Sequence, residues 1–148
     1  MIENKLVNKL KEKKYKISFA ESCTGGMLAS TIINVSGSSN IIEESYITYS
    51  ENAKMKILGV KKETLEKYTV YSKEVALEMA EGLKKISNSN ICISVTGIAE
   101  SNSVCKCYYC IIINDEIIVK EYKTNGNRNE VRTNYTNQIL TEIYNKIG

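Results

Sequence analysis

Hydrophobic and polar residues follow two different periods along this chain, and the periods divide it into helices and strands. Apolar residues at helical spacing, Leu6, Val7 and Leu10, predict an N-terminal helix, and the mostly apolar run Ile17–Ala20 predicts a buried strand after it. The same two patterns recur to the end of the chain. We expect further helices over residues 25–35, 51–58, 72–83 and 128–147, a helical turn over 64–68, and further strands over 46–49, 91–95, 107–113 and 117–122.

The order of these elements predicts the fold class. Helices alternate with strands from the N-terminus, and the last two strands flank Asn114 and Asp115, which indicates a hairpin. This order is typical of an α/β protein with a mixed β-sheet between two layers of helices. We therefore expect a single three-layer α/β/α domain over residues 1–148.

Charge and hydropathy restrict the partners of such a domain. The 148 residues include 20 basic and 17 acidic side chains, for a formal net charge of +3. This balance does not favour a nucleic-acid or membrane partner, and no apolar run approaches the roughly 20 residues that cross a bilayer. We predict a soluble, cytoplasmic protein with a small-molecule partner, and the sequence leaves formation of a homo-oligomer open.

One turn carries most of the chemical information. Residues 20–26 are rich in hydroxyl groups, end in Gly25 and Gly26, and lie between a predicted strand and a predicted helix, where backbone N–H groups and the helix dipole favour an anion. The chain contains no histidine. A nucleophile such as Ser22 therefore needs a base from Lys, Tyr or a carboxylate. The alternative is that Ser22 only belongs to a capped helix entry.

A second segment offers such a base. If Ser50 is the N-cap of the helix over 51–58, which Gly59 ends, then Lys54 lies one turn later on the same face. The positive end of the helix and partial burial both lower the pKa of a lysine, which a lysine base requires. The alternative is that Lys54 is one of many surface lysines.

The five cysteines do not predict a cofactor. Cys105 and Cys107 share one face of a strand while Cys110 points to the other, and no histidine completes a ligand set, so we expect neither a metal site nor a cofactor. Small buried hydrophobic side chains are the better interpretation. Cys23 is a second candidate nucleophile beside Ser22, but it has no histidine partner to lower its pKa.

Several motifs in this order resemble one family. They are residues 21–26, residues 49–54 followed by 58–60, the helix from Ser72 to Gly82, and residues 95–99. The chain resembles the C-terminal domain of the competence/damage-inducible protein CinA, whose free-standing members are nicotinamide-nucleotide amidohydrolases. The resemblance covers nearly the whole chain, without the molybdopterin-binding-like domain that precedes this one in longer members.

The resemblance implies an activity and a site. The activity is hydrolysis of the carboxamide of nicotinamide mononucleotide to nicotinate mononucleotide and ammonia, without a metal. Ser22 corresponds to the nucleophile, Lys54 to its base, and Tyr49 to a member of the same hydrogen-bond network. The implied substrate-binding residues are Thr24, Gly25, Gly26, Thr96, Gly97 and Arg128, with Arg128 as a phosphate or substrate anchor.

One segment departs from the family pattern. Residues 100–106 contain no Gly or Pro, whereas the family has a longer Gly/Pro-rich loop, and Glu100 stands where the family has Gly. Such loops commonly supply backbone donors to a phosphate or an oxyanion. This departure supports an alternative function, that of a catalytically weakened or inactive nucleotide-binding or regulatory relative on the same fold.

Overall fold

Five β-strands form one mixed sheet in the computed structural model, which describes residues 1–148. The strand order is β2-β1-β3-β4-β5; β2, β1 and β3 are parallel, while β4 and β5 are antiparallel to their neighbours. The strands are β1 (Ile17–Glu21), β2 (Ile42–Ile47), β3 (Ile91–Gly97), β4 (Cys105–Ile113) and β5 (Glu116–Thr124). Every residue of β1 and β3 is buried, as expected for parallel strands covered on both faces.

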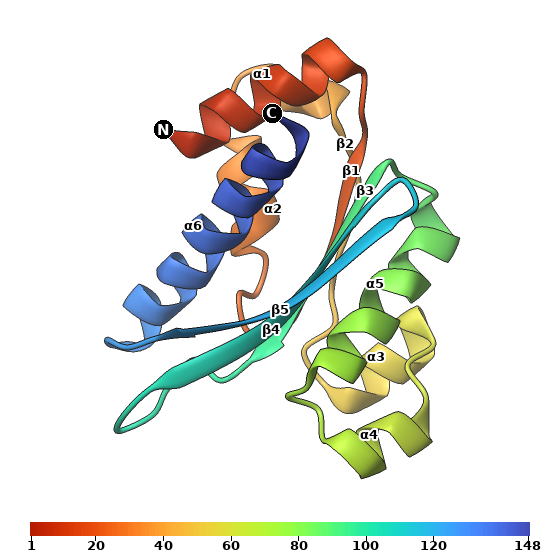
Figure 1. The fold of residues 1–148 in the computed structure, drawn as a ribbon, viewed down its shortest axis with the longest axis vertical. Helices are drawn as coiled ribbons and strands as arrows, with labels where there is room; N and C mark the ends of the chain where they lie inside the picture. The colour runs from red at the N-terminus through yellow and green to blue at the C-terminus, as the bar shows by residue number, and fades with distance from the viewer.

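Helices cover both faces of this sheet (Figure 1). They are α1 (Ile2–Lys13), α2 (Met27–Ile33), α3 (Glu51–Leu58), α4 (Lys62–Tyr68), α5 (Lys73–Ser87) and α6 (Arg128–Ile147), with a 3₁₀ turn over Ser38–Asn40. Helices α1, α2 and α6 pack on one face, and α3, α4 and α5 lie on the other. The α/β/α fold class predicted from the sequence is confirmed.

Two apolar clusters hold the layers together. The larger joins α1, α2 and α6 to the sheet through 24 buried residues, and the smaller joins α3, α4 and α5 to it through 12. A fully buried Leu, Ile or Phe contributes about 1.5–3 kcal/mol relative to an exposed one. Leu10, Phe19 and Leu83 are among those with no exposed surface.

Capping residues account for several helix boundaries. The Ser50 and Ser72 hydroxyls accept hydrogen bonds from the Ala53 and Val75 N–H groups at 3.0 and 3.2 Å, so both are N-caps. Gly59 ends α3 in the left-handed conformation, with φ of +71°. The predictions that Ser50 begins α3 and Gly59 ends it are confirmed.

The strand predicted over 46–49 is displaced in the structure. The strand is β2, Ile42–Ile47, whereas Thr48 and Tyr49 lie beyond its end. β2 is an edge strand in which half-buried and exposed residues alternate, and Glu43 and Glu44 interrupt its apolar pattern. The sequence pattern therefore marked the end of this strand more clearly than its beginning.

The cysteines lie on both sides of the sheet. Cys105 and Cys107 are buried in the cluster under α1, α2 and α6, and Cys110 is buried in the opposite cluster. All five thiols are free and buried, and no three acidic, cysteine or histidine side chains are grouped so that they would hold a metal ion. None of the helices combines the length and the apolar character required to span a bilayer.

Candidate active site

Three parallel strands end at one edge of the sheet, and a pocket of about 430 Å³ lies there. Ser22 directly follows β1, Tyr49 follows β2 by two residues, and Gly97 is the last residue of β3; all three line the pocket. The carboxyl ends of parallel strands are the usual ligand sites of α/β sheets. The turns after β1 and β3 therefore face one crevice.

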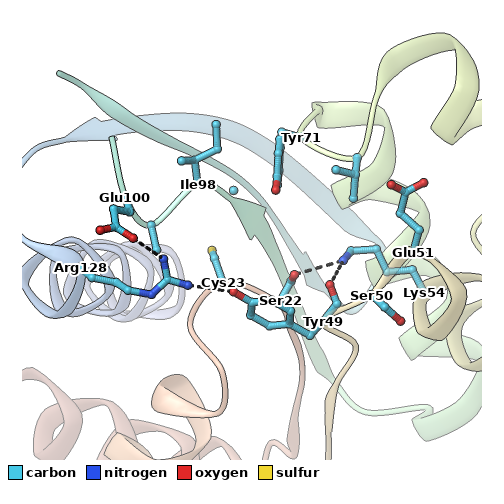
Figure 2. Close-up of a pocket in the computed structure, with 13 residues that line it drawn as sticks. Ser22, Cys23, Tyr49, Ser50, Glu51, Lys54, Tyr71, Ile98, Glu100 and Arg128 are labelled. Atoms are coloured by element: carbon cyan, nitrogen blue, oxygen red, sulfur yellow. Dashed lines mark hydrogen bonds and ion pairs between the residues drawn. The ribbon is translucent and has the colours of Figure 1, made fainter. Parts of the chain in front are cut away.

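Lys54 reaches Ser22 from α3. Its ammonium nitrogen lies 3.1 Å from Ser22 Oγ, and the side chain is only 1% exposed (Figure 2). The same nitrogen donates to the Thr48 carbonyl at 2.9 Å and to the Tyr49 carbonyl at 3.2 Å. Lys54 is therefore a buried partner of Ser22, and its interpretation as a surface lysine is wrong.

The two carbonyl groups orient the amine. A neutral lysine nitrogen carries two N–H donors and one lone pair, and a charged one carries three donors. When Thr48 and Tyr49 accept the two N–H groups of the neutral form, the remaining direction, toward Ser22 Oγ, is that of the lone pair. The arrangement suits a base that takes a proton from the Ser22 hydroxyl.

Burial also adjusts the charge of this lysine. Desolvation lowers the pKa of Lys54 below its ordinary value, because the charged form loses its hydration. The carboxylate of Glu51, three residues earlier, acts in the opposite direction and raises that pKa by a smaller amount. The lowering that the sequence predicted is thus present, and its main cause is burial.

The turn that carries Ser22 is held by the buried carboxylate of Glu21. This carboxylate accepts hydrogen bonds from the backbone N–H groups of Leu28 and Ala29, at 2.9 and 3.0 Å, and from the Thr24 hydroxyl. The sequence predicts that the start of this helix favours an anion, and the chain's own Glu21 carboxylate occupies that position. This role was not visible in the sequence, because a glutamate at the end of a strand is usually exposed.

Arg132 also stabilises this turn. The Nε and Nη2 atoms of Arg132 donate to the carbonyl oxygens of Cys23 and Thr24 at 3.1 and 2.7 Å. A Cβ atom on Gly25 would lie 3.2 Å from Arg132 Nη2, and Gly25 has a φ of +57°. The spacing in the sequence could have identified Arg132, because it lies one helical turn after Arg128 on the same face of α6.

The remaining predicted substrate-binding residues fall into two groups. Gly97 and Arg128 line the pocket, whereas Thr24, Gly25, Gly26 and Thr96 do not. Thr24 donates to Glu21, and the buried Thr96 hydroxyl donates to the Val70 carbonyl at 3.0 Å. Both threonine hydroxyls are therefore bonded within the protein and do not line the pocket.

Tyr49 joins the network in two ways. Its carbonyl accepts from Lys54, while its hydroxyl accepts from Arg128 Nη2 at 3.0 Å. Arg128 Nη1 in turn donates to Glu100 at 3.2 Å, so one guanidinium links Tyr49 and Glu100 at the pocket rim (Figure 2). It is thus the Tyr49 main chain, and not its ring hydroxyl, that holds Lys54.

Cys23 also lines the pocket, but its thiol is not activated. Burial raises the pKa of Cys23 to about 12, and the Glu21 carboxylate acts in the same direction. A thiol is nucleophilic as the thiolate, which such a pKa suppresses near neutral pH. Ser22 is the better candidate nucleophile.

Comparison with known proteins identifies the family of this chain. The family model described as "CinA C-terminal domain" matches residues 1–147. The chain belongs to the CinA C-terminal domain family. A CinA-like protein of Petrotoga mobilis is 42% identical over 141 residues, which cover 91% of this chain but 35% of that relative. This CinA C-terminal domain therefore spans about a third of the length of that curated relative.

Solved structures share the whole fold. The competence or damage-inducible protein from Enterobacter asburiae superposes with a TM-score of 0.95 at 26% identity, covering 99% of this chain and 96% of that one. The competence/damage inducible protein CihA from Agrobacterium tumefaciens gives a TM-score of 0.86 at 28% identity, covering 96% and 91%. The sheet and the helices around the pocket are thus those of the CinA superfamily.

Proposed function

We propose that this CinA C-terminal domain hydrolyses the carboxamide of a nicotinamide nucleotide, taking nicotinamide mononucleotide to nicotinate mononucleotide and ammonia. The observation that carries the proposal is the 3.1 Å contact between Ser22 Oγ and the buried Lys54 nitrogen in an accessible pocket. A serine–lysine pair is one of the few hydrolytic devices open to a chain without histidine. The choice of nicotinamide mononucleotide as substrate rests on the family resemblance.

The first half of the reaction forms an ester. Neutral Lys54 takes the proton of the Ser22 hydroxyl, and Oγ forms a bond to the carboxamide carbon. The tetrahedral intermediate then breaks its C–N bond, and the nitrogen leaves as ammonia with the proton that Lys54 returns. Ser22 is left acylated by the nicotinoyl group.

The second half restores the enzyme. Lys54, neutral again, takes a proton from a water molecule, whose oxygen attacks the ester carbon. The C–O bond to Ser22 breaks, Ser22 Oγ recovers the proton from Lys54, and the acid product leaves as the carboxylate after it loses its own proton to water. One lysine therefore serves both halves, as base and then as acid.

The pocket has the size and lining of a small-molecule site. Its volume of about 430 Å³ lies within the range of about 300–1,000 Å³ typical of such sites. Val70, Tyr71 and Ile98 line the pocket with apolar atoms that can contact a planar ring, and Tyr49 and Lys54 lie beside Ser22 (Figure 2). This division suits an aromatic amide whose carbonyl carbon approaches Ser22.

Ammonia release from nicotinamide mononucleotide tests the proposal. We expect the wild-type protein to form ammonia and nicotinate mononucleotide in equal amounts, Ser22→Ala to lose the activity, and Cys23→Ala to retain most of it. Activity that survives Ser22→Ala but not Cys23→Ala would assign the reaction to the thiol. No ammonia from the folded wild-type protein would favour the non-catalytic, nucleotide-binding alternative.

A further inference from the structure

Arg128 at the rim of the pocket is already paired with a carboxylate. It is the first residue of α6; its Nη1 donates to Glu100 at 3.2 Å, and its Nη2 donates to the Tyr49 hydroxyl at 3.0 Å. Glu100 lies in the segment between β3 and β4. Both terminal nitrogens of the guanidinium are therefore engaged by the protein itself.

No other permanent cation lines the pocket. Arg132 does not line it and donates to the Cys23 and Thr24 carbonyls, and Lys54 must be neutral to act as a base. The lining carries two carboxylates, those of Glu51 and Glu100. With Lys54 neutral, the pocket has one positive and two negative side chains.

This balance is unfavourable for a dianionic ligand group. A phosphate that reaches Arg128 must approach the Glu100 carboxylate or displace it. The negative charges of the phosphate and the carboxylate repel each other when both lie beside the same guanidinium. A neutral or cationic ligand meets no such repulsion, and a carboxylate accepts hydrogen bonds from sugar hydroxyls. The pocket as built therefore suits a ligand that ends in hydroxyl groups.

We propose that Glu100 is a specificity-determining residue that, through its ion pair with Arg128, selects against a terminal phosphate and favours the phosphate-free nucleoside form of the amide. The proposal rests on the amide hydrolysis proposed above and refines its substrate class. Nicotinamide riboside is the probe for the favoured class, because it shares the pyridinium carboxamide and the ribose with the mononucleotide and lacks only the phosphate.

The size of the effect follows from the exposure of the pair. The side chains of Glu100 and Arg128 are 75% and 52% exposed, so water and salt screen their charges. We expect the Glu100 carboxylate to change the preference between the two ligands about three- to tenfold at low ionic strength. The preference should shrink as salt is added, which a purely steric role of Glu100 would not produce.

Binding and turnover of both ligands test the proposal. We would titrate nicotinamide mononucleotide and nicotinamide riboside calorimetrically into Ser22→Ala and into Ser22→Ala with Glu100→Gln, at low and high salt, and measure kcat/KM with Ser22 intact. Glu100→Gln keeps the size of the side chain and removes its charge. Glu116→Gln is the matched control, because Glu116 is exposed at the opposite end of the sheet, beside the β4–β5 turn.

The expected result is a three- to tenfold gain in mononucleotide affinity with Glu100→Gln, a change of less than twofold for the riboside, and no change with Glu116→Gln. If the two affinities shift in this way while neither ligand yields ammonia, the amide hydrolysis is wrong and the role of Glu100 stands. If Glu100→Gln changes the ratio of the mononucleotide and riboside affinities by less than twofold, the role of Glu100 is overturned. The absence of binding by both ligands would also overturn it.

Discussion

At the scale of single residues, the protonation state of Lys54 decides whether it can act as the proposed base. The two carbonyls of residues 48 and 49 hold its N–H groups, and burial lowers its pKa. A base acts in its neutral form, and the neutral fraction rises with pH through the pKa. If Lys54 is the base, as we propose, activity should rise with pH, because below its pKa Lys54 is increasingly protonated and cannot accept the Ser22 proton.

The pH profile of kcat/KM for nicotinamide mononucleotide checks this. We expect the rate to rise with pH and to level off below the ordinary lysine pKa of about 10.4. Glu51→Gln should move the rising limb to lower pH, because the Glu51 carboxylate raises the Lys54 pKa. A profile that is flat from mildly acid to alkaline pH, or a limb that Glu51→Gln moves upward, would contradict a lysine base.

Glu21 is the second residue with a testable role. Glu21→Gln replaces a carboxylate that accepts three hydrogen bonds with an amide whose NH₂ group faces the same donors. We expect a loss of about 2–4 kcal/mol in the free energy of unfolding, measured with urea. Glu116→Gln serves again as the exposed control. A Glu21→Gln loss of no more than about 0.5 kcal/mol, the size of ordinary surface effects, would contradict the role of Glu21.

At the scale of elements, the packing of α5 against α3 positions Lys54. Gly82 of α5 lies so close to the end of α3 that an added Cβ would fall 1.8 Å from the Leu58 carbonyl oxygen. The two helices can approach in this way only because position 82 has no side chain. Since α3 carries Lys54, a displacement of this helix also changes the position of Lys54 relative to Ser22.

Gly82→Ala tests the coupling of this contact to the site. We expect it to lower the free energy of unfolding by about 2 kcal/mol or more and to reduce ammonia release, because α3 must move to relieve the clash. The matched variant is Gly59→Ala, because an added Cβ there would meet no atom within 4 Å. Only the left-handed backbone conformation, with φ of +71°, opposes a side chain at this position, and we expect it to lower the free energy of unfolding by about 1 kcal/mol. Equal unfolding free energies and equal activities for the two variants would show that the contact does not position α3.

At the scale of the whole molecule, the sequence predicted the fold more completely than the site. The caps at Ser50 and Ser72 and the uninterrupted burial of β1 and β3 are local or periodic features, which sequence patterns report directly. The acceptors that hold Lys54 are backbone carbonyls whose directions depend on how the chain leaves β2. The burial of Glu21 likewise depends on α2 folding back over the end of β1.

The burial of all five cysteines leads to a further prediction. Burial raises the pKa of both Cys23 and Cys110 to about 12 and also raises that of Cys107. We expect a thiol reagent to label none of the five rapidly in the native protein near neutral pH and all five after denaturation. Rapid native labelling of Cys23 would instead identify an activated thiol in the pocket.

The central claim is that Ser22 and Lys54 act as one catalytic unit, and a double-mutant measurement of ammonia release from nicotinamide mononucleotide tests it most directly. Residues that act together are strongly non-additive. We expect Ser22→Ala and Lys54→Met each to lower the rate by about 10³-fold or more, and the double variant to be no more than a few-fold slower than either. Losses that multiply in the double variant, or a Lys54→Met protein with near wild-type activity, would contradict the account.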